Sequence, residues 1–140
     1  MHKVAYLTGR SYRGRALAPG QVPELENISY ELITAAGAAQ GVSFEVAFWD
    51  DPALPQRGYD LALLRTTWDY HERPQQFLDQ LSAFEAAGLP VFNTPEVVRW
   101  NFRKTYLKEL GPSAIETVWV DKVEPHVVAA LPAARRAYTL

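Results

Sequence analysis

Short apolar segments alternate with stretches of helical periodicity along most of this chain, and that order constrains the fold more than any single motif does. Residues 61–64 are an uninterrupted apolar run, which is typical of a parallel strand covered on both faces. Residues 42–48 show a period of two, as a half-buried strand does. Other strands are expected at 4–7, 91–92 and 114–120, and helices at 24–40, 74–88, 94–99, 101–110 and 123–134.

This order predicts a doubly wound, mainly parallel open sheet of the Rossmann-like α/β class, with helices on both faces. In such sheets, ligands bind beyond the carboxyl ends of the strands. Two polar segments are expected at that edge: an arginine-rich loop at 9–23 and the segment 65–70. The first predicted helix carries an apolar stripe, which in an amphipathic helix faces the core. Its members are Leu25, Ile28, Leu32, Ile33 and Ala36.

The composition is that of a globular protein without extreme charge. Hydrophobic residues make up 48% of the 140 residues, charged residues 21%, and the formal net charge is −2. That balance indicates neither a nucleic-acid surface nor a polybasic membrane anchor. No apolar run approaches the roughly 20 residues of a membrane helix, and the N-terminus has no signal-peptide core. We therefore expect a cytoplasmic protein of one domain, or of one domain plus a fragment.

Residue counts also argue against two kinds of site. The chain has no cysteine, which excludes disulfides, thiolate metal sites and a cysteine nucleophile. His2, His71 and His126 are far apart and form no recognised ligand spacing, so no metal site is expected.

The segment 65–70 combines a cation, two hydroxyls, a carboxylate and two large aromatic rings at the end of a buried strand. Arg65 is suited to bind a carboxylate or phosphate at two points, and Asp69 to hold an amine. The aromatic ring of Trp68 or Tyr70 would line the pocket of an organic ligand. In the alternative, Arg65 and Asp69 pair with each other while the aromatic rings cover a helix end. The residues alone leave both interpretations open.

The same segment carries a family resemblance. Residues 60–71, with Arg-Thr-Thr-Trp-Asp-Tyr at their centre, resemble the N-terminal domain of RimK-like ATP-grasp proteins, and most closely the cyclo-ligase subgroup of D-cycloserine biosynthesis. The pattern continues in Asn-Thr-Pro-Glu-Val-Val-Arg-Trp-Asn at 93–101, in Phe-Trp-Asp-Asp-Pro at 48–52, and in Lys104, Tyr106 and Leu107. The resemblance spans roughly residues 42–120.

The resemblance implies roles for individual residues. The N-terminal domain's part of the acceptor pocket corresponds to Arg65, Thr67, Trp68, Asp69 and Tyr70, although packing is an equally good role for Trp68. Lys104 corresponds to the first phosphate-contacting lysine, and its alternative is a solvated helix lysine. Arg103 replaces the acidic residue that usually precedes that lysine, which departs from the family pattern. Trp100 and Asn101 correspond to positions that shape the domain junction.

In this superfamily a carboxylate is phosphorylated by ATP and an amine attacks the acyl phosphate, with Mg²⁺ bridging the phosphates. The resemblance therefore implies a substrate-binding domain at 1–98 and the truncated start of an ATP-grasp domain at 99–140. The second phosphate lysine, the lid loop and the magnesium ligands are missing. We expect this chain alone to be inactive, with ATP and Mg²⁺ belonging to the intact parent and not binding tightly here. The expected substrate is a small carboxylate or amino-acid-like molecule.

A fragment would also leave apolar surface that the missing domain covers. We therefore expect self-association, with a homodimer burying the truncated face. The candidate residues are Leu107, Leu110, Val118 and Val120.

Two other functions compete with the ligase interpretation. One is a stand-alone, non-catalytic module that binds an anionic metabolite at Arg65 and the arginine loop, or a protein partner. The other is a phospho-receiver domain, which needs an acidic pair after the first strand and an aspartate after the third. Thr8-Gly9-Arg10 and Arg65-Thr66 occupy those places, which argues against a receiver.

Overall fold

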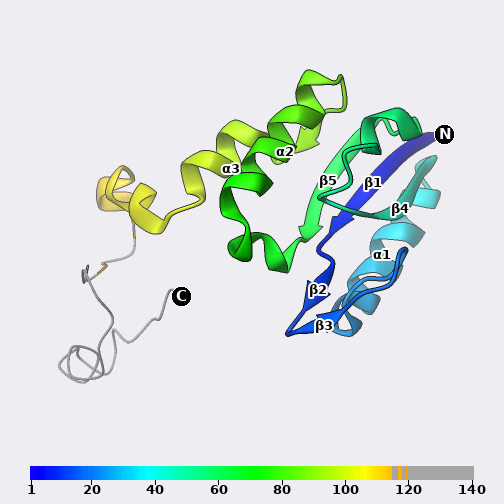
Figure 1. The fold of residues 1–140 in the computed structure, drawn as a ribbon, viewed down its shortest axis with the longest axis horizontal. Helices are drawn as coiled ribbons and strands as arrows, with labels where there is room; N and C mark the ends of the chain where they lie inside the picture. The colour runs from blue at the N-terminus through cyan, green and yellow to red at the C-terminus, as the bar shows by residue number, and fades with distance from the viewer. Residues whose placement is uncertain (115–116, 118, 120–140) are drawn as a thin grey trace. The chain divides into compact units, whose positions relative to one another are not determined.

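The computed structural model describes residues 1–114, 117 and 119. Its centre is a four-stranded parallel sheet with the strand order β4-β1-β5-β6 (Figure 1). The strands are β1 (His2–Thr8), β4 (Val42–Phe48), β5 (Leu61–Thr66) and β6 (Val91–Phe92). The α-helices of the described residues are α1 (Asn27–Ala38), α2 (Pro74–Ala86) and α3 (Pro95–Asn101). The predicted α/β class with a mainly parallel sheet is confirmed.

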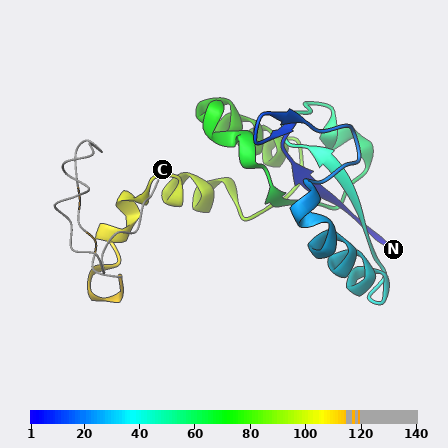
Figure 2. The ribbon, with the colours of Figure 1, turned by 90° about the horizontal axis from the view of Figure 1, so that it is seen from below.

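Helices α1 and α2 cover opposite faces of the sheet (Figure 2). Strand β1 lies between β4 and β5, and its residues from Val4 to Thr8 are buried. The ring of Tyr6 meets that of Tyr30 on α1 at a centroid distance of 5.0 Å. The ring of Trp49 meets that of Phe77 on α2 at 5.1 Å. The core therefore has two layers, one on each side of β1.

Most of the apolar stripe predicted at 24–40 faces solvent, and of its members only Ile33 is half-buried. Leu25, Ile28 and Leu32 are 68%, 71% and 67% exposed. The helix instead approaches the sheet at Gly37, where a Cβ atom would lie 2.5 Å from the Phe44 ring. A residue without a side chain permits that close approach but adds nothing to a hydrophobic pattern. For this reason the periodicity indicated the helix correctly and its buried face incorrectly.

The loop predicted at 9–23 contains a small hairpin that the sequence analysis missed. Strands β2 (Ser11–Tyr12) and β3 (Arg15–Ala16) pair in the antiparallel direction. The two residues between them, Arg13 and Gly14, have φ angles of +50° and +73°. Positive φ at both central residues is the signature of a tight two-residue hairpin turn. Gly14 is the one sequence feature that indicates this turn. The strands themselves were not predicted, because apolar and polar residues do not alternate around Gly14.

Near the C-terminus, the helix predicted at 101–110 is replaced by two short 3₁₀ segments, Lys104–Lys108 and Gly111–Ser113. The helix predicted at 94–99 corresponds to α3. The strand predicted at 114–120 lies largely outside the described residues, and the helix predicted at 123–134 lies wholly outside them.

The aspartate that precedes β5 ties this strand to β1. The backbone N–H of Lys3 donates to Oδ2 of Asp60 at 2.7 Å, and the backbone N–H of Asp60 donates to the Lys3 carbonyl at 2.8 Å. The first of these bonds is the main reason why the pKa of Asp60 lies below its usual value, because it stabilises the ionised carboxylate. Asp60 thus aligns the first residues of the two central strands.

The chain groups into two compact units, Met1–Arg99 and Trp100–Leu140. The domain assignments made from the sequence stay predictions. In the second unit, the Trp100 indole N–H donates to Glu109 at 2.7 Å, and the Trp100 ring lies 4.7 Å from that of Tyr106. No helix within the described residues is long and apolar enough to cross a membrane.

Candidate functional site

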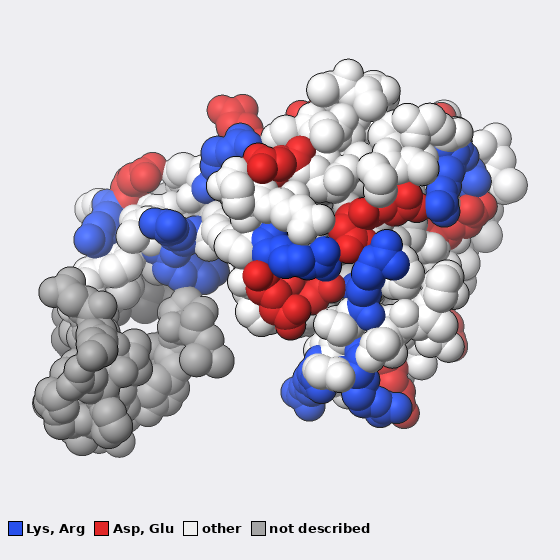
Figure 3. All heavy atoms as spheres, in the orientation of Figure 1, with Lys and Arg blue, Asp and Glu red and all other residues white. Residues whose placement is uncertain are grey.

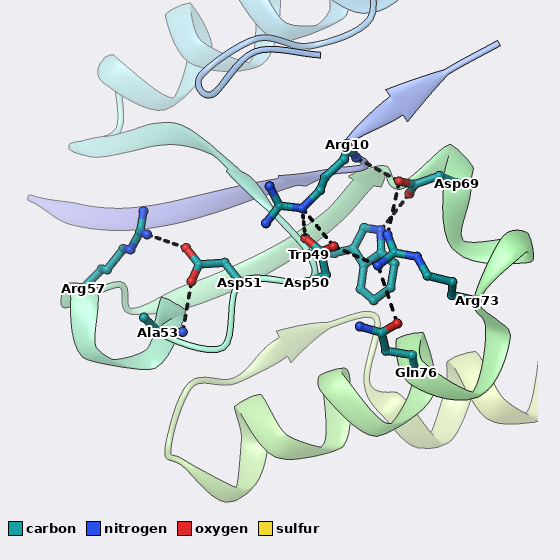
Figure 4. A network of polar contacts seen from close by, with 9 residues as sticks. All are labelled: Arg10, Trp49, Asp50, Asp51, Ala53, Arg57, Asp69, Arg73 and Gln76. Carbon is teal, nitrogen blue, oxygen red and sulfur yellow. Dashed lines mark hydrogen bonds and ion pairs between the residues drawn. The ribbon is translucent and has the colours of Figure 1, made fainter. Parts of the chain in front are cut away.

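The segments that follow β1, β4 and β5 meet at the carboxyl edge of the sheet, and their polar side chains form one connected network (Figure 4). We call its five members the edge cluster. They are Arg10, Trp49, Asp50, Asp69 and Arg73.

Asp69 is the most enclosed carboxylate of the edge cluster, with 4% of the residue exposed. Its Oδ1 accepts a hydrogen bond from the Trp49 indole N–H at 2.7 Å. Its Oδ2 accepts from the backbone N–H of Arg10 at 2.8 Å and lies 3.7 Å from a guanidinium nitrogen of Arg73. Charge-assisted contacts of this kind hold a buried carboxylate in one position.

Asp50 bridges the two arginines of the edge cluster. Its carboxylate oxygens accept from Nε of Arg10 at 2.7 and 2.9 Å, and one of them also accepts from Arg73 at 3.0 Å. The guanidinium of Arg10 lies 4.5 Å from the centroid of the Phe48 ring, and that of Arg73 lies 4.7 Å from Trp49. Two carboxylates thus alternate with two guanidiniums, so the cluster balances its own charge.

Gly9 allows Asp69 to reach this position. Gly9 is buried, and its backbone N–H donates to the Thr66 carbonyl at 3.1 Å. A Cβ atom on Gly9 would lie 2.6 Å from Cγ of Asp69 and 2.9 Å from Oδ2. Real Cβ atoms do not approach other heavy atoms so closely. The glycine is therefore required by the carboxylate beside it.

A register shift between β1 and β5 separates Arg65 from its neighbours. Leu7 pairs with Leu64, but the next residue, Thr8, pairs with Thr66. Arg65 is therefore the extra residue of a bulge, a feature that re-aims side chains at the ends of strands. The hydroxyl of Thr66 donates to that of Thr8 at 2.9 Å, and Thr66 is 2% exposed. Arg65 is exposed.

The interpretation in which Arg65 pairs with Asp69 is wrong. The cation beside Asp69 is Arg73, which stands one helical turn later and directly before α2. Within the described part of the chain, the Arg65 side chain makes no hydrogen bond or ion pair. Arg65 is therefore available for a ligand, whereas the Asp69 oxygens already accept from protein donors.

The remaining predicted site residues follow Arg65 on the same segment. Thr67 is half-buried, Trp68 is 49% exposed and Tyr70 is 36% exposed. The Trp68 ring lies 6.0 Å from that of Tyr12 in β2, and the Tyr70 ring lies 5.3 Å from that of Phe77. Both aromatic rings thus have one side against protein and part of their surface open to solvent.

Lys104 belongs to the second unit, where its ammonium lies 5.8 Å from the centroid of the Tyr106 ring. Its contact with ATP phosphate stays a prediction. Residues 1–114, 117 and 119 contain no group of three or more side chains suited to hold a metal ion.

Sequence reasoning missed three members of the edge cluster as site residues. Trp49 and Asp50 entered the sequence analysis only within the resemblance at 48–52, and Arg73 had no assigned role. A signal did exist, because Phe-Trp-Asp-Asp-Pro had been noted as part of the resemblance. Pairing it with the segment 65–70 required knowing that β4 and β5 both flank β1.

These features define the class: a parallel α/β domain with a cluster of polar side chains at the carboxyl edge of its strands. The profile of the family described as "D-cycloserine synthetase DcsG, N-terminal domain" matches residues 4–93 of this chain. The chain belongs to this family. The match includes the whole edge cluster and residues 65–70.

A solved structure has the same fold. The crystal structure of D-cycloserine synthetase DcsG superposes with a TM-score of 0.60 at 20% sequence identity, over 77% of this chain and 32% of that chain. The matched part of the present chain thus spans about a third of the length of that synthetase. No curated protein matches the sequence significantly.

Proposed function

We propose that this chain is the substrate-binding N-terminal portion of an ATP-dependent carboxylate–amine ligase. The observation that carries the proposal is the family match at residues 4–93, which contains the complete edge cluster. ATP and Mg²⁺ would be bound by the remainder of the parent protein, with Lys104 as one phosphate contact. The chain by itself would bind substrate without converting it.

In this proposal Arg65 and Arg10 bind the acidic group of the substrate. Arg65 lacks a carboxylate partner in the described part of the chain. Arg10 uses only Nε for its bonds to Asp50, and its terminal nitrogens point away from that carboxylate (Figure 4). Guanidinium groups with free terminal N–H donors suit a planar carboxylate. Thr67, Trp68 and Tyr70 would contact the rest of the substrate.

Asp69 takes a positioning role rather than a direct one. Its enclosure and its bonds to Trp49 and to the Arg10 backbone leave little access for a substrate amine. By fixing the Arg10 backbone and the ion pairs of Arg73, it would set the direction in which the Arg10 guanidinium extends.

A thermal-shift comparison tests the proposal. At a concentration one hundred times its dissociation constant, a ligand stabilises the folded state by about 2.7 kcal/mol. We expect an amino acid or dipeptide to raise the melting temperature of the wild type but not of Arg65→Ala. Arg103→Ala is the control, because Arg103 is an exposed arginine of the other unit. Equal stabilisation of all three proteins would contradict a substrate role for Arg65.

We also propose self-association, through α1 rather than through the face predicted from the sequence. Leu25, Ile28 and Leu32 are about two-thirds exposed, whereas Leu110 is 38% exposed. The large side chains lie in the 3₁₀ turn Glu24–Glu26 and in the first half of α1, and two small ones, Ala35 and Ala39, follow at the same helical spacing. Antiparallel packing of two copies about an axis at Leu32 would set large residues against small ones, as a two-fold interface requires.

Sedimentation velocity distinguishes the two faces. We expect a dimer for the wild type at micromolar concentration and a monomer for Leu32→Glu, because the substitution places two carboxylates at the axis. Leu110→Glu should remain a dimer. The reverse pattern would favour the truncated face, and a monomeric wild type would contradict self-association altogether.

A further inference from the structure

We propose that the cavity between the β2–β3 hairpin and the start of α1 binds a small organic anion, namely a carboxylate or phosphate attached to a flat apolar body. The cavity has a volume of about 680 Å³. Ligand pockets typically enclose roughly 300–1,000 Å³. Arg65, Trp68 and the edge cluster are not among its lining residues, so its ligand goes beyond the function proposed above. The cavity adjoins the substrate segment, because the ring of its lining residue Tyr12 lies 6.0 Å from that of Trp68.

The hairpin side of the cavity is basic. Arg13 and Arg15 line it, and Glu24 is the one carboxylate among the lining residues. The Arg13 and Arg15 side chains make no hydrogen bond or ion pair with any described residue, and the guanidinium of Arg13 lies 5.3 Å from the centroid of the Tyr12 ring. Figure 3 shows basic side chains gathered over this end of the molecule. Two guanidiniums without protein acceptors suit a carboxylate or phosphate.

The turn geometry gives an independent reason to look for a ligand. Arg13 has a φ angle of +50°, and it is the single non-glycine residue with positive φ in the described part of the chain. Asparagine or glycine is favoured at this turn position, since other side chains destabilise a left-handed backbone. The turn requires the positive φ but not an arginine, and non-glycine residues held in this conformation cluster at functional sites. Here the side chain at the strained position is one of the two cations that line the cavity.

The rest of the lining suits an apolar body. The ring of Tyr12 lines the cavity from the hairpin, and the ring of Tyr30 lines it from α1. Val22, which is 9% exposed, also lines it. The hydroxyl of Tyr30 donates to the Phe44 carbonyl at 3.2 Å, which fixes its ring. Asn27 adds an amide able to bond a polar substituent. Aromatic rings beside two cations suit an anion that carries a flat apolar group, because the rings can cover that group while the guanidiniums bind the charge.

Heteronuclear NMR on the whole chain tests this site with phenyl phosphate, inorganic phosphate and phenol as probes. We expect phenyl phosphate to shift the amide signals of residues 11–17 and 24–30, with at least tenfold tighter binding than either other probe. Arg15→Ala should weaken phenyl phosphate binding at least tenfold. Arg65→Ala and Arg103→Ala should leave it unchanged, which separates this site from the substrate site.

Arg13→Gly is a second test variant, and it is not expected to unfold the protein. Because glycine relieves the strained turn, this variant should melt at a higher temperature than the wild type while binding phenyl phosphate more weakly. Three results would overturn the proposal: unchanged binding by Arg15→Ala, equal binding of inorganic phosphate, or amide shifts that follow residues 65–70 and vanish in Arg65→Ala. The last would assign the anion to the substrate site.

Discussion

Replacing Gly9 with alanine is expected to destabilise the domain by about 3 kcal/mol, because overpacking alone costs about 1–3 kcal/mol and the displaced group is a buried carboxylate. The new Cβ would lie 2.6 Å from Cγ of Asp69. Asp69 cannot simply rotate away, since Trp49 and the backbone of Arg10 hold its two oxygens. The backbone at Gly9 cannot retreat easily either, because it bonds to the Thr66 carbonyl. Urea unfolding of both proteins measures the difference.

Gly58→Ala is the matched control for this prediction. Gly58 has a φ angle of +70° and open space around its Cα, so alanine there meets a conformational cost and no collision. That cost is about 1–2 kcal/mol. A Gly9→Ala variant no less stable than Gly58→Ala would mean that the Asp69 carboxylate is not held beside residue 9.

The sheet could be predicted because its signals are local. The apolar run at 61–64 and the alternation at 42–48 each report burial directly, and β5 and β4 form there. The face of α1 could not be predicted, because the contact that orients the helix is made by Gly37 against Phe44. A missing side chain has no hydrophobicity to count. The β2–β3 hairpin was not predicted either, because strands of two residues are too short to show an alternation of apolar and polar side chains.

The candidate site divides in the same way. The position of residues 65–70 at the carboxyl edge follows from the order of elements, and the sequence indicated it correctly. The partner of Asp69 does not follow from that order. It depends on β4 lying beside β1, which brings Trp49 and Asp50 next to the loop that carries Arg10. Proximity in sequence makes a pair of Arg65 with Asp69 one of two open interpretations, whereas in the structure Arg65 lies at a bulge and Asp69 pairs with Arg73.

Replacing Asp69 with asparagine should show how much depends on that carboxylate. The two oxygens of Asp69 accept from two different N–H donors, the Trp49 indole and the Arg10 backbone. An asparagine amide has one oxygen and one NH₂ group, so either orientation sets a donor against a donor. The nearby Arg73 also loses one of its two carboxylates. Breaking a fully buried charge pair costs about 3–5 kcal/mol. We expect a loss of about 3 kcal/mol, because the Arg73 side chain is 36% exposed and Asp50 still pairs with it.

Asp51→Asn is the matched control for Asp69→Asn. Like Asp69, the Asp51 carboxylate accepts from a backbone N–H and pairs with an arginine. Asp51 accepts from the backbone of Ala53 at 3.0 Å and pairs with Arg57, whose side chain is 53% exposed. One amide oxygen can keep the backbone bond, and the guanidinium can turn to water. Exposed pairs contribute about 0–1 kcal/mol, so this variant should lose no more than that in urea unfolding.

The two variants also separate folding from binding. In Asp69→Asn the Trp49 indole N–H loses its charged acceptor, so its NMR signal should move while that of Trp100, bonded to Glu109 in the other unit, stays in place. If Asp69 acts by positioning Arg10, substrate-induced stabilisation should be lost even at temperatures where Asp69→Asn remains folded. Retention of that stabilisation together with a shifted Trp49 signal would mean that Asp69 supports the fold alone, and that Arg65 binds the substrate without an oriented Arg10.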